Sequence, residues 1–458
     1  MKIKRLLVLA LAIIMVFSIC GCSGGKPPVN GTDNGVGQTG KIDIVKEGTT
    51  PVEEGLNLKG KTITYAIGLP LSDTMQRQLI AFQNKYGCKV ETDLLGFQDY
   101  VQLLASRMAG GKTYDIIQLE GLRFPSIAIS QFVTPLEDVI TTADWNTGDP
   151  TKGGFNEDES SYFMWNNHLY AVVCSQGEFS SKPALTFYNK KIIAEVGGDD
   201  PRELYEKGKW NYDAFKKLGE LIAKNTNARI CNLSYARSFV SASSAYIYDF
   251  SDPHNPKANL TSAEYINNAN TLQEFTSGSN PIVGMEGYGD HTATAFFEGK
   301  VAFQAGSVFD LYDNHCIGKG VENSNAFNKS LDNLGIVPAP TRSVDDMRHS
   351  SSWLYGIAAG YGTSDARIAM AFAKHSATFS TINNNADYKY SEADKKLINK
   401  LAAEKKKVNA YCFSDGSNTD YLLVQKLQWE IAEGGDVAQL VATYNAQLQN
   451  CIDVTLAQ

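Results

Sequence analysis

The sequence predicts an α/β fold in which doubly wound sheets form two lobes. Between residues 61 and 119, segments with the two-residue apolar period of a strand alternate with segments of helical period. About 400 of the 458 residues remain once an N-terminal export signal and the polar segment behind it are set apart. Because single cores stop growing near about 250 to 300 residues, a chain of this length should divide into two lobes.

The chain begins with an export signal that ends at a lipidation site. Three basic residues precede the apolar run 6–19, which is shorter than the roughly 20 residues that a permanent membrane helix needs. The following Cys20-Gly21-Cys22 resembles the bacterial lipobox, in which a small residue stands just before the modified cysteine. We therefore expect removal of 1–21 and lipidation of Cys22, since a bulky residue precedes Cys20. An ordinary cleaved signal and an uncleaved anchor are the alternatives.

Residues 22–59 should form a lipidated, flexible linker. The segment is rich in Gly, Pro, Asn and Thr and lacks the apolar periodicity that a core requires. A coil of this length has an r.m.s. span of roughly 30 Å. We therefore expect the folded part at the outer face of the cytoplasmic membrane, held by its lipid anchor and able to meet a membrane partner.

The charge balance argues against nucleic acid as a partner. The formal net charge is −8, and loss of the three basic residues of the signal would make it −11. Binding to phosphates needs a basic face, which this acidic balance does not suggest.

Neither a metal nor a cofactor is expected. The histidines are scattered and no CxxC pair is present, so a zinc site is not predicted. The cysteines outside the lipobox are spaced too widely to dictate disulfides, although export permits them, and we expect free thiols. They are Cys88, Cys174, Cys231, Cys316, Cys412 and Cys451.

The first strand, helix and second strand are marked by start and stop signals. Residues 61–67 (KTITYAI) alternate like a strand and stop at a Gly-Leu-Pro turn. Ser72 can cap the next helix and Gly87 can end it, with apolar residues at helical spacing between them. Residues 88–95 are typical of a second strand.

Further elements follow from the same signals. A second helix over 98–109 should stop at paired glycines, and a third strand should cover 114–119 (YDIIQL). Residues 163–173 predict a hairpin that turns at two asparagines. Trp210 should anchor the entry of a helix that Asn211 caps.

Eight segments along the chain follow one another in a recognisable order. They read FQNKYGCKVE, DYVQLLASRMAGGKTYDIIQL, QFVTPLEDVI, HLYAVV with LTFYNKKIIAEVGGD, GKWNYDAFKKLGELI, FFEGKVAFQAGSVFDL, DNLGIVPAP and WLYGIAAGYGTSDARIAMAFAKH. In this order they resemble family 1 of the extracellular solute-binding proteins, the receptors of carbohydrate ABC importers. The sequence departs from the family pattern at Tyr114 and Val173, where proline is usual.

This resemblance implies a type II periplasmic-binding-protein-like fold, in which hinge crossings join two α/β lobes and a solute binds in the cleft between them. The first lobe would cover 60–178 plus 343–378, and the second 179–341 plus 379–458. The implied ligand is a sugar or oligosaccharide, which a monomer would deliver to the permease subunits of an ABC importer.

One loop is a ligand-site candidate on its position alone. Glu120 lies at the carboxyl end of the third strand, directly after 119, and Arg123 and Phe124 follow where a helix should begin. In α/β sheets, ligands bind outside the carboxyl ends of the strands. We expect contact by at least one of the three. The alternative is a Glu120–Arg123 surface pair beside a core Phe124.

Further candidates lie at the expected hinge crossings and in the second lobe. They are Gln176, Glu178, Phe179, Arg237, Phe309, Asp310 and Trp353. Phe309 falls where the family commonly carries a ligand-stacking aromatic, and the indole of Trp353 could cap the cleft. Each of these residues could instead pack, face solvent or satisfy backbone groups at the hinge.

Two other functions stay open at this point. An exported glycoside hydrolase would also bind sugar, and the paired carboxylates that it needs cannot be excluded from spacing along a chain. No motif marks such a carboxylate pair, and the resemblance is to binding proteins, so we expect a binding protein and not an enzyme. A binding module that feeds a membrane sensor kinase would share all of these features.

Overall fold

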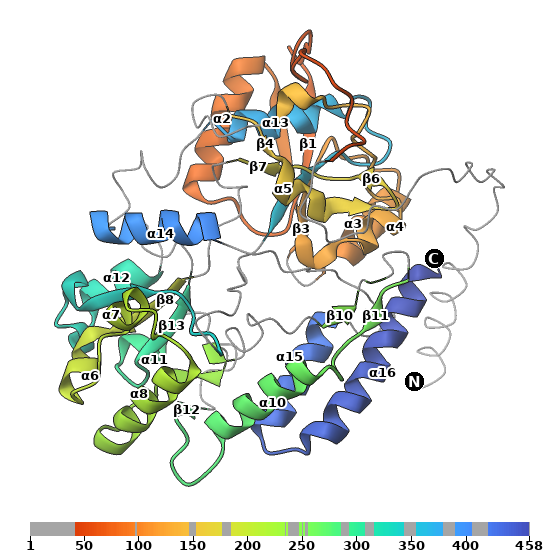
Figure 1. Cartoon of the computed structure of the whole chain (residues 1–458). Coiled ribbons are helices and arrows are strands. Elements are labelled where there is room, and N and C mark those ends of the chain that lie inside the picture. Colours follow the sequence, from red (N-terminus) through yellow and green to blue (C-terminus); the bar gives the residue numbers. More distant parts are fainter. Residues whose placement is uncertain are drawn as a thin grey trace, which may run out of the picture. The chain divides into compact units, whose positions relative to one another are not determined.

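The computed structural model of the chain (Figure 1) describes residues 42–96, 99–145, 153–175, 185–233, 235–236, 247–249, 251, 255–284, 293–306, 316–342, 354–378, 390–404 and 420–457. The export signal and the predicted lipidation site at Cys22 lie outside these ranges. No described helix combines the length and the apolar character that crossing a bilayer requires.

The first sheet is mainly parallel. β1 (Thr62–Ile67), β2 (Lys89–Leu94), β3 (Ile116–Glu120) and β15 (Tyr355–Ala358) form it in the order β15-β3-β1-β2. β1 runs parallel to β2 and to β3, whereas β15 pairs antiparallel with β3. The three strands predicted between residues 61 and 119 are thereby confirmed. The pairing with β15 is long-range, and local periodicity did not predict it.

Helices cover both faces of this sheet. α2 (Asp73–Tyr86) and α13 (Arg367–Ser376) pack on one face, where Tyr65 of β1 meets an aromatic ring of α13. Ala66, the next residue of β1, packs instead with buried side chains of α3 (Tyr100–Ala109). Successive residues of one strand therefore face different helices, as a doubly wound sheet requires.

Local signals set several boundaries as predicted. Ser72 Oγ accepts a hydrogen bond of 3.1 Å from the backbone N–H three residues further on, and Gly87 ends α2 in the left-handed region at φ 63°. Asn166 and Asn167 turn the predicted hairpin with φ angles of 48° and 61°. Asn211 caps α8 (Tyr212–Asn225) through its side chain.

Residues 42–58 form an N-terminal strap that belongs to the folded core. Four of its apolar side chains are between 1% and 5% exposed, and they pack with the face of the first sheet that α2 and α13 cover. They are Ile42, Val45, Val52 and Leu58. The prediction of a coreless linker over 22–59 is therefore wrong for the strap. Its apolar residues are spaced too irregularly to show a helical or strand period, which is why composition alone indicated a coil.

A buried charge cluster fastens the strap. Lys374 Nζ on α13 lies 2.9 Å from Glu53 Oε2 of the strap and 3.0 Å from Asp144 Oδ1. Asp144 is fully buried, and it also accepts hydrogen bonds from the backbone N–H groups of Val52 and Thr141, both at 2.9 Å. The strap, α13 and the 3-10 turn that contains Asp144 are thus held together by one network.

The second sheet is antiparallel in its described strands. β8 (Leu185–Asn189) lies between β13 (Phe303–Gly306) and β14 (Leu334–Val337). The alternation of strands and helices before residue 120 did not predict this pairing. Trp210 is buried beside the cap of α8, and its Nε1 donates to the Pro338 carbonyl at 2.9 Å, so its predicted anchoring role is confirmed.

Two helices at the end of the chain pack with one helix from its middle. α10 (Ala263–Thr276), α15 (Asp420–Ala432) and α16 (Val437–Leu456) pack together. The other described helices are α4 (Ser126–Ile129), α5 (Glu157–Ser160), α6 (Lys190–Glu195), α7 (Pro201–Glu206), α11 (Thr294–Phe297), α12 (Cys316–Asn323) and α14 (Glu392–Glu404). The other described strands are β4 (Phe155–Asn156), β5 (Met164–Trp165), β6 (His168–Leu169), β7 (Val173–Cys174), β9 (Cys231–Asn232), β10 (Tyr248–Asp249), β11 (Lys257–Ala258) and β12 (Val283–Gly284).

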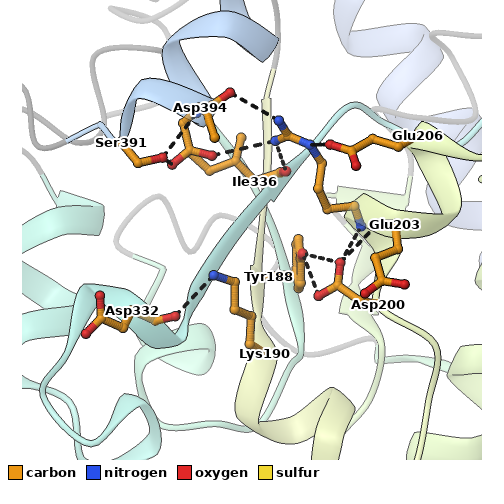
Figure 2. Close-up of polar contacts among 11 residues, drawn as sticks. Tyr188, Lys190, Asp200, Glu203, Glu206, Asp332, Ile336, Ser391 and Asp394 are labelled. Carbon is orange, nitrogen blue, oxygen red and sulfur yellow. Dashed lines mark hydrogen bonds and ion pairs between the residues drawn. The ribbon is translucent and has the colours of Figure 1, made fainter.

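Arg202 on α7 ties α14 to the second sheet. Figure 2 draws polar contacts around its partners Ile336, Glu206 and Asp394. The Arg202 guanidinium donates to the carbonyls of Ile336 on β14 and Ala393 in α14, both at 3.2 Å. It also lies 2.9 Å from Glu206 Oε1 and 3.6 Å from Asp394 Oδ1. α14 is therefore attached to the same unit as β14.

The described cysteines carry free thiols, as expected; they are Cys88, Cys174, Cys231 and Cys451. Cys412 and the side chain of Cys316 lie outside the described part of the chain. Among the residues that the structure describes, no group of three or more His, Cys, Asp or Glu side chains could hold a metal ion.

Candidate functional site

The candidate site lies at the carboxyl edge of the first sheet. Glu120 is the last residue of β3, and Gly68 directly follows β1, the strand beside it. Neighbouring parallel strands end at the same edge of a sheet, so the residues that follow the two strands come close together there. Four residues meet at this edge and are called the edge cluster below: Gly68, Tyr100, Glu120 and Arg123.

An ion pair forms the centre of the edge cluster. Arg123 places both Nε and Nη2 on one oxygen of Glu120, Oε2, at 3.1 Å and 3.0 Å. The two side chains are 7% and 3% exposed. The pair of the alternative interpretation is therefore formed, but it lies in a buried position and not at the surface.

Tyr100 supplies a platform for the guanidinium. The Arg123 Cζ atom lies 4.2 Å from the centroid of the Tyr100 ring, which is a close cation–π contact. Tyr100 is itself fixed, since its hydroxyl donates to the carbonyl of Gln118 on β3 at 2.8 Å. The first residue of α3 thus holds Arg123 from one side while Glu120 holds it by hydrogen bonds.

Gly68 packs closely against the ion pair. A Cβ atom at this position would lie 3.1 Å from Glu120 Oε1 and 3.4 Å from Tyr100 Cδ2. Contacts this short would force the carboxylate or the ring to move. The Gly-Leu-Pro turn that ends the first strand therefore also leaves room for the Glu120 carboxylate.

Burial sets the ionisation of this edge. It raises the pKa of the Glu120 carboxyl, and the adjacent Arg123 guanidinium offsets part of that rise. Tyr355 lies opposite Glu120 in the pairing of β15 with β3, and its pKa is raised by burial and further by the Glu120 charge. Burial also raises the pKa of Tyr100. Both phenols are therefore neutral at physiological pH.

The predicted loop residues take different places. Glu120 and Arg123 come together at the edge, whereas Phe124 lies in the core and packs edge-on against Phe163 with ring centroids 5.5 Å apart. Sequence reasoning missed Tyr100 and Gly68 as members of the site. The turn signal at Gly68 was visible, but only the fold brings it beside Glu120.

The other candidates lie outside the described residues: Gln176, Glu178, Phe179, Arg237, Phe309, Asp310 and Trp353. Their roles stay predictions. What the described edge offers chemically is a rigid carboxylate and guanidinium that can accept and donate hydrogen bonds.

Family membership follows from the sequence. The sequence profile of the bacterial extracellular solute-binding proteins matches residues 70–378, which is more than half of the chain. The chain belongs to this family. It is therefore a solute-binding protein of the extracellular class, and not the glycoside hydrolase that the sequence had left open. A comparison with curated protein sequences finds no match.

Solved structures similar to this solute-binding protein confirm its type II periplasmic-binding-protein-like fold. The GacH receptor of Streptomyces glaucescens, solved unliganded and with acarbose, has a TM-score of 0.62 at 14% identity, covering 86% of this chain and 99% of that chain. A transporter-associated binding protein from B. animalis subsp. lactis, in complex with β-1,6-galactobiose, has a TM-score of 0.59 at 14% identity over 86% and 97%. UgpB from Mycobacterium tuberculosis, in complex with glycerophosphocholine, has a TM-score of 0.58 at 16% identity over 86% and 98%.

Proposed function

We propose that this solute-binding protein captures a sugar or oligosaccharide between its two lobes and delivers it to the permease subunits of an ABC importer. The observation that carries the proposal is the family match over residues 70–378. Similar structures that hold acarbose and β-1,6-galactobiose support a carbohydrate as the ligand. Binding would favour the closed arrangement of the lobes, because a ligand shifts a conformational equilibrium only through a difference in affinity.

The edge cluster is the contact that we propose from the first lobe. Sugars present many hydroxyl groups, and Glu120 can accept from them while Arg123 can donate. Phe309 and Trp353 are proposed as aromatic surfaces for the apolar faces of the sugar rings. The remaining predicted contacts are Gln176, Glu178, Phe179, Arg237 and Asp310.

The proposed lobes are 60–178 plus 343–378 and 179–341 plus 379–458. The division is supported by the sheets, since the strands of the first sheet all lie in the former ranges and those of the second in the latter. The strap extends the first lobe to residue 42. We further propose a monomer at the outer face of the cytoplasmic membrane, lipidated at Cys22.

A thermal-shift screen of the soluble domain against mono- and oligosaccharides tests the function. A ligand at 100 times its Kd should stabilise the protein by about 2.7 kcal/mol, and calorimetry of each hit gives the affinity. The bound sugar should be recovered intact by chromatography. A screen in which no sugar stabilises the domain would overturn the proposal. If the protein binds sugar but co-purifies with a sensor kinase and not with a permease, its proposed role would change from import to sensing.

A further inference from the structure

We infer that Tyr355 is a further ligand contact and that it reads one hydroxyl group of the bound sugar together with Glu120. The Tyr355 hydroxyl donates a hydrogen bond to the sugar oxygen, and Glu120 Oε1 accepts one from the same sugar hydroxyl. The inference rests on the proposed function and deepens it, because it adds a contact residue that the sequence did not indicate and names the chemical group that this residue recognises.

The position of Tyr355 brings it to the candidate site. Tyr355 is the first residue of β15, and it pairs directly with Glu120, the last residue of β3. Because β15 runs antiparallel to β3, its first residue lies at the carboxyl edge of the parallel strands, where ligands of α/β sheets bind. Residues directly opposite each other in an antiparallel pair have Cβ atoms about 4.5 to 5.5 Å apart on one face of the sheet. The phenol and the carboxylate therefore begin side by side.

The electrostatic surroundings of Tyr355 support this proximity. Burial raises the pKa of the Tyr355 phenol, the Glu120 charge raises it further, and the Arg123 charge lowers it. Interactions between charges weaken with distance, so the phenol lies near both members of the ion pair. The net rise keeps the hydroxyl protonated at physiological pH, and its proton is therefore available for donation.

The Tyr355 hydroxyl has an open donor. Within the described part of the chain this hydroxyl makes no hydrogen bond, and the side chain is only partly buried. Tyr100 at the same edge differs, because its hydroxyl donates to the Gln118 carbonyl at 2.8 Å. Tyrosine hydroxyls that are shielded from water usually have a partner. Of these two phenols, Tyr355 is therefore the one that can donate to a ligand.

Glu120 supplies the complementary acceptor. Its Oε2 atom takes two hydrogen bonds from Arg123, whereas no described residue makes a hydrogen bond to Oε1. The guanidinium favours the ionised form of Glu120, in which carboxylate oxygens accept hydrogen bonds and cannot donate them. Among the residues that the structure describes, no hydrogen bond joins the Tyr355 hydroxyl to Glu120. Donor and acceptor can therefore both serve a third group.

A donor beside an acceptor suits a hydroxyl group. One sugar hydroxyl can accept from Tyr355 and donate to Glu120 at the same time, whereas an ether oxygen only accepts and an ammonium group only donates. Backbone bonds hold the two residues in register, since the Gly121 N–H donates to the Leu354 carbonyl at 2.8 Å just beyond them. The two side chains therefore select a ligand that carries a hydroxyl at one particular position.

Calorimetry with deoxygenated sugars tests the inference. A sugar that stabilises the wild-type protein is compared with its monodeoxy analogues, in the wild type and in Tyr355→Phe, which keeps the ring and removes the hydroxyl. Tyr355→Phe should bind the parent sugar at least about fivefold more weakly, as expected for one lost hydrogen bond. One monodeoxy analogue should bind the two proteins within about twofold of each other, because it lacks the hydroxyl that Tyr355 contacts.

Tyr361→Phe is the matched control. Tyr361 lies beyond the opposite end of β15 and is 56% exposed, so loss of its hydroxyl should change the affinity by less than about twofold. A folded Tyr355→Phe protein with wild-type affinity would overturn the inference alone. An equal loss of affinity for the parent sugar and for every analogue would also overturn it, because the loss would then not depend on a sugar hydroxyl.

A crystal structure of the wild-type protein with the same sugar gives a second measurement that does not depend on the folding of a variant. One sugar hydroxyl should lie within about 3.2 Å of both Tyr355 Oη and Glu120 Oε1. A bound sugar without such a hydroxyl would overturn the inference and leave the proposed function standing. Failure of the wild type to bind any sugar would overturn the proposed function and the inference together.

Discussion

Replacing Lys374 with methionine should detach the N-terminal strap from α13. The Lys374 side chain is 13% exposed, and it lies at 3.0 Å from Asp144, which is completely buried, and at 2.9 Å from Glu53. Methionine keeps most of the apolar stem and removes the charge. The Asp144 carboxylate would then be buried without its cation.

The expected loss is about 2 to 4 kcal/mol of unfolding free energy. Breaking a buried ion pair by removing one partner typically costs about 3 to 5 kcal/mol. The expected loss extends somewhat below that range, because Asp144 keeps its hydrogen bonds from the N–H groups of Val52 and Thr141. The Glu53 side chain is also 29% exposed and can recover hydration.

Urea unfolding and hydrogen exchange measure this effect. Exchange of the strap amides should rise with the loss of stability, since Val52 N–H is bonded to Asp144. Lys46→Met is the matched control, because it removes a lysine of the strap whose pair with Asp138 is exposed, and it should cost no more than about 0.5 kcal/mol. Equal stability losses in the two variants would refute the reasoning.

Two further predictions concern acid stability and anchoring. Burial opposes ionisation of Asp93, but hydrogen bonds from Lys112, Tyr114 and Arg107 hold its pKa below the usual value. The stabilisation by ionised Asp93 is thus fully present above the pKa of the unfolded state, near about 3.9, and it is lost as pH falls through the folded pKa. In urea titrations, the difference in unfolding free energy between wild type and Asp93→Asn should therefore be widest near pH 7 and should close below about pH 4. Cys22→Ala should release the protein into the medium or leave its signal uncleaved on immunoblots of cell fractions, and equal membrane retention of wild type and variant would contradict lipidation there.

Features set by neighbouring residues could be predicted from the sequence. The caps at Ser72 and Asn211 and the stop at Gly87 depend on hydrogen bonds and φ angles within one helical turn. Alternation of strands and helices likewise reflects which face of each segment is apolar. Such signals predicted the three parallel strands of the first sheet, but not its antiparallel strand β15.

Features that depend on distant partners could not be predicted. The strap is held by Asp144 and Lys374, which lie far along the chain, so a search for local period found only a polar, glycine-rich segment. At the candidate site, the pairing of Glu120 and Arg123 was foreseen only as the alternative to ligand contact, and at the surface. Its burial comes from Tyr100 and the turn at Gly68, whose proximity only the folded sheet shows.

The attachment of α14 by Arg202 has a practical use in sensor design. Because the guanidinium bonds to the carbonyls of both Ile336 and Ala393, a probe on α14 would move with the second sheet as one body. Lys396 is an exposed attachment point on this helix, and Gln76 is its exposed counterpart on α2. A donor and an acceptor dye at these two positions would report the proposed closure of the lobes as an optical signal, without altering a residue of the edge cluster.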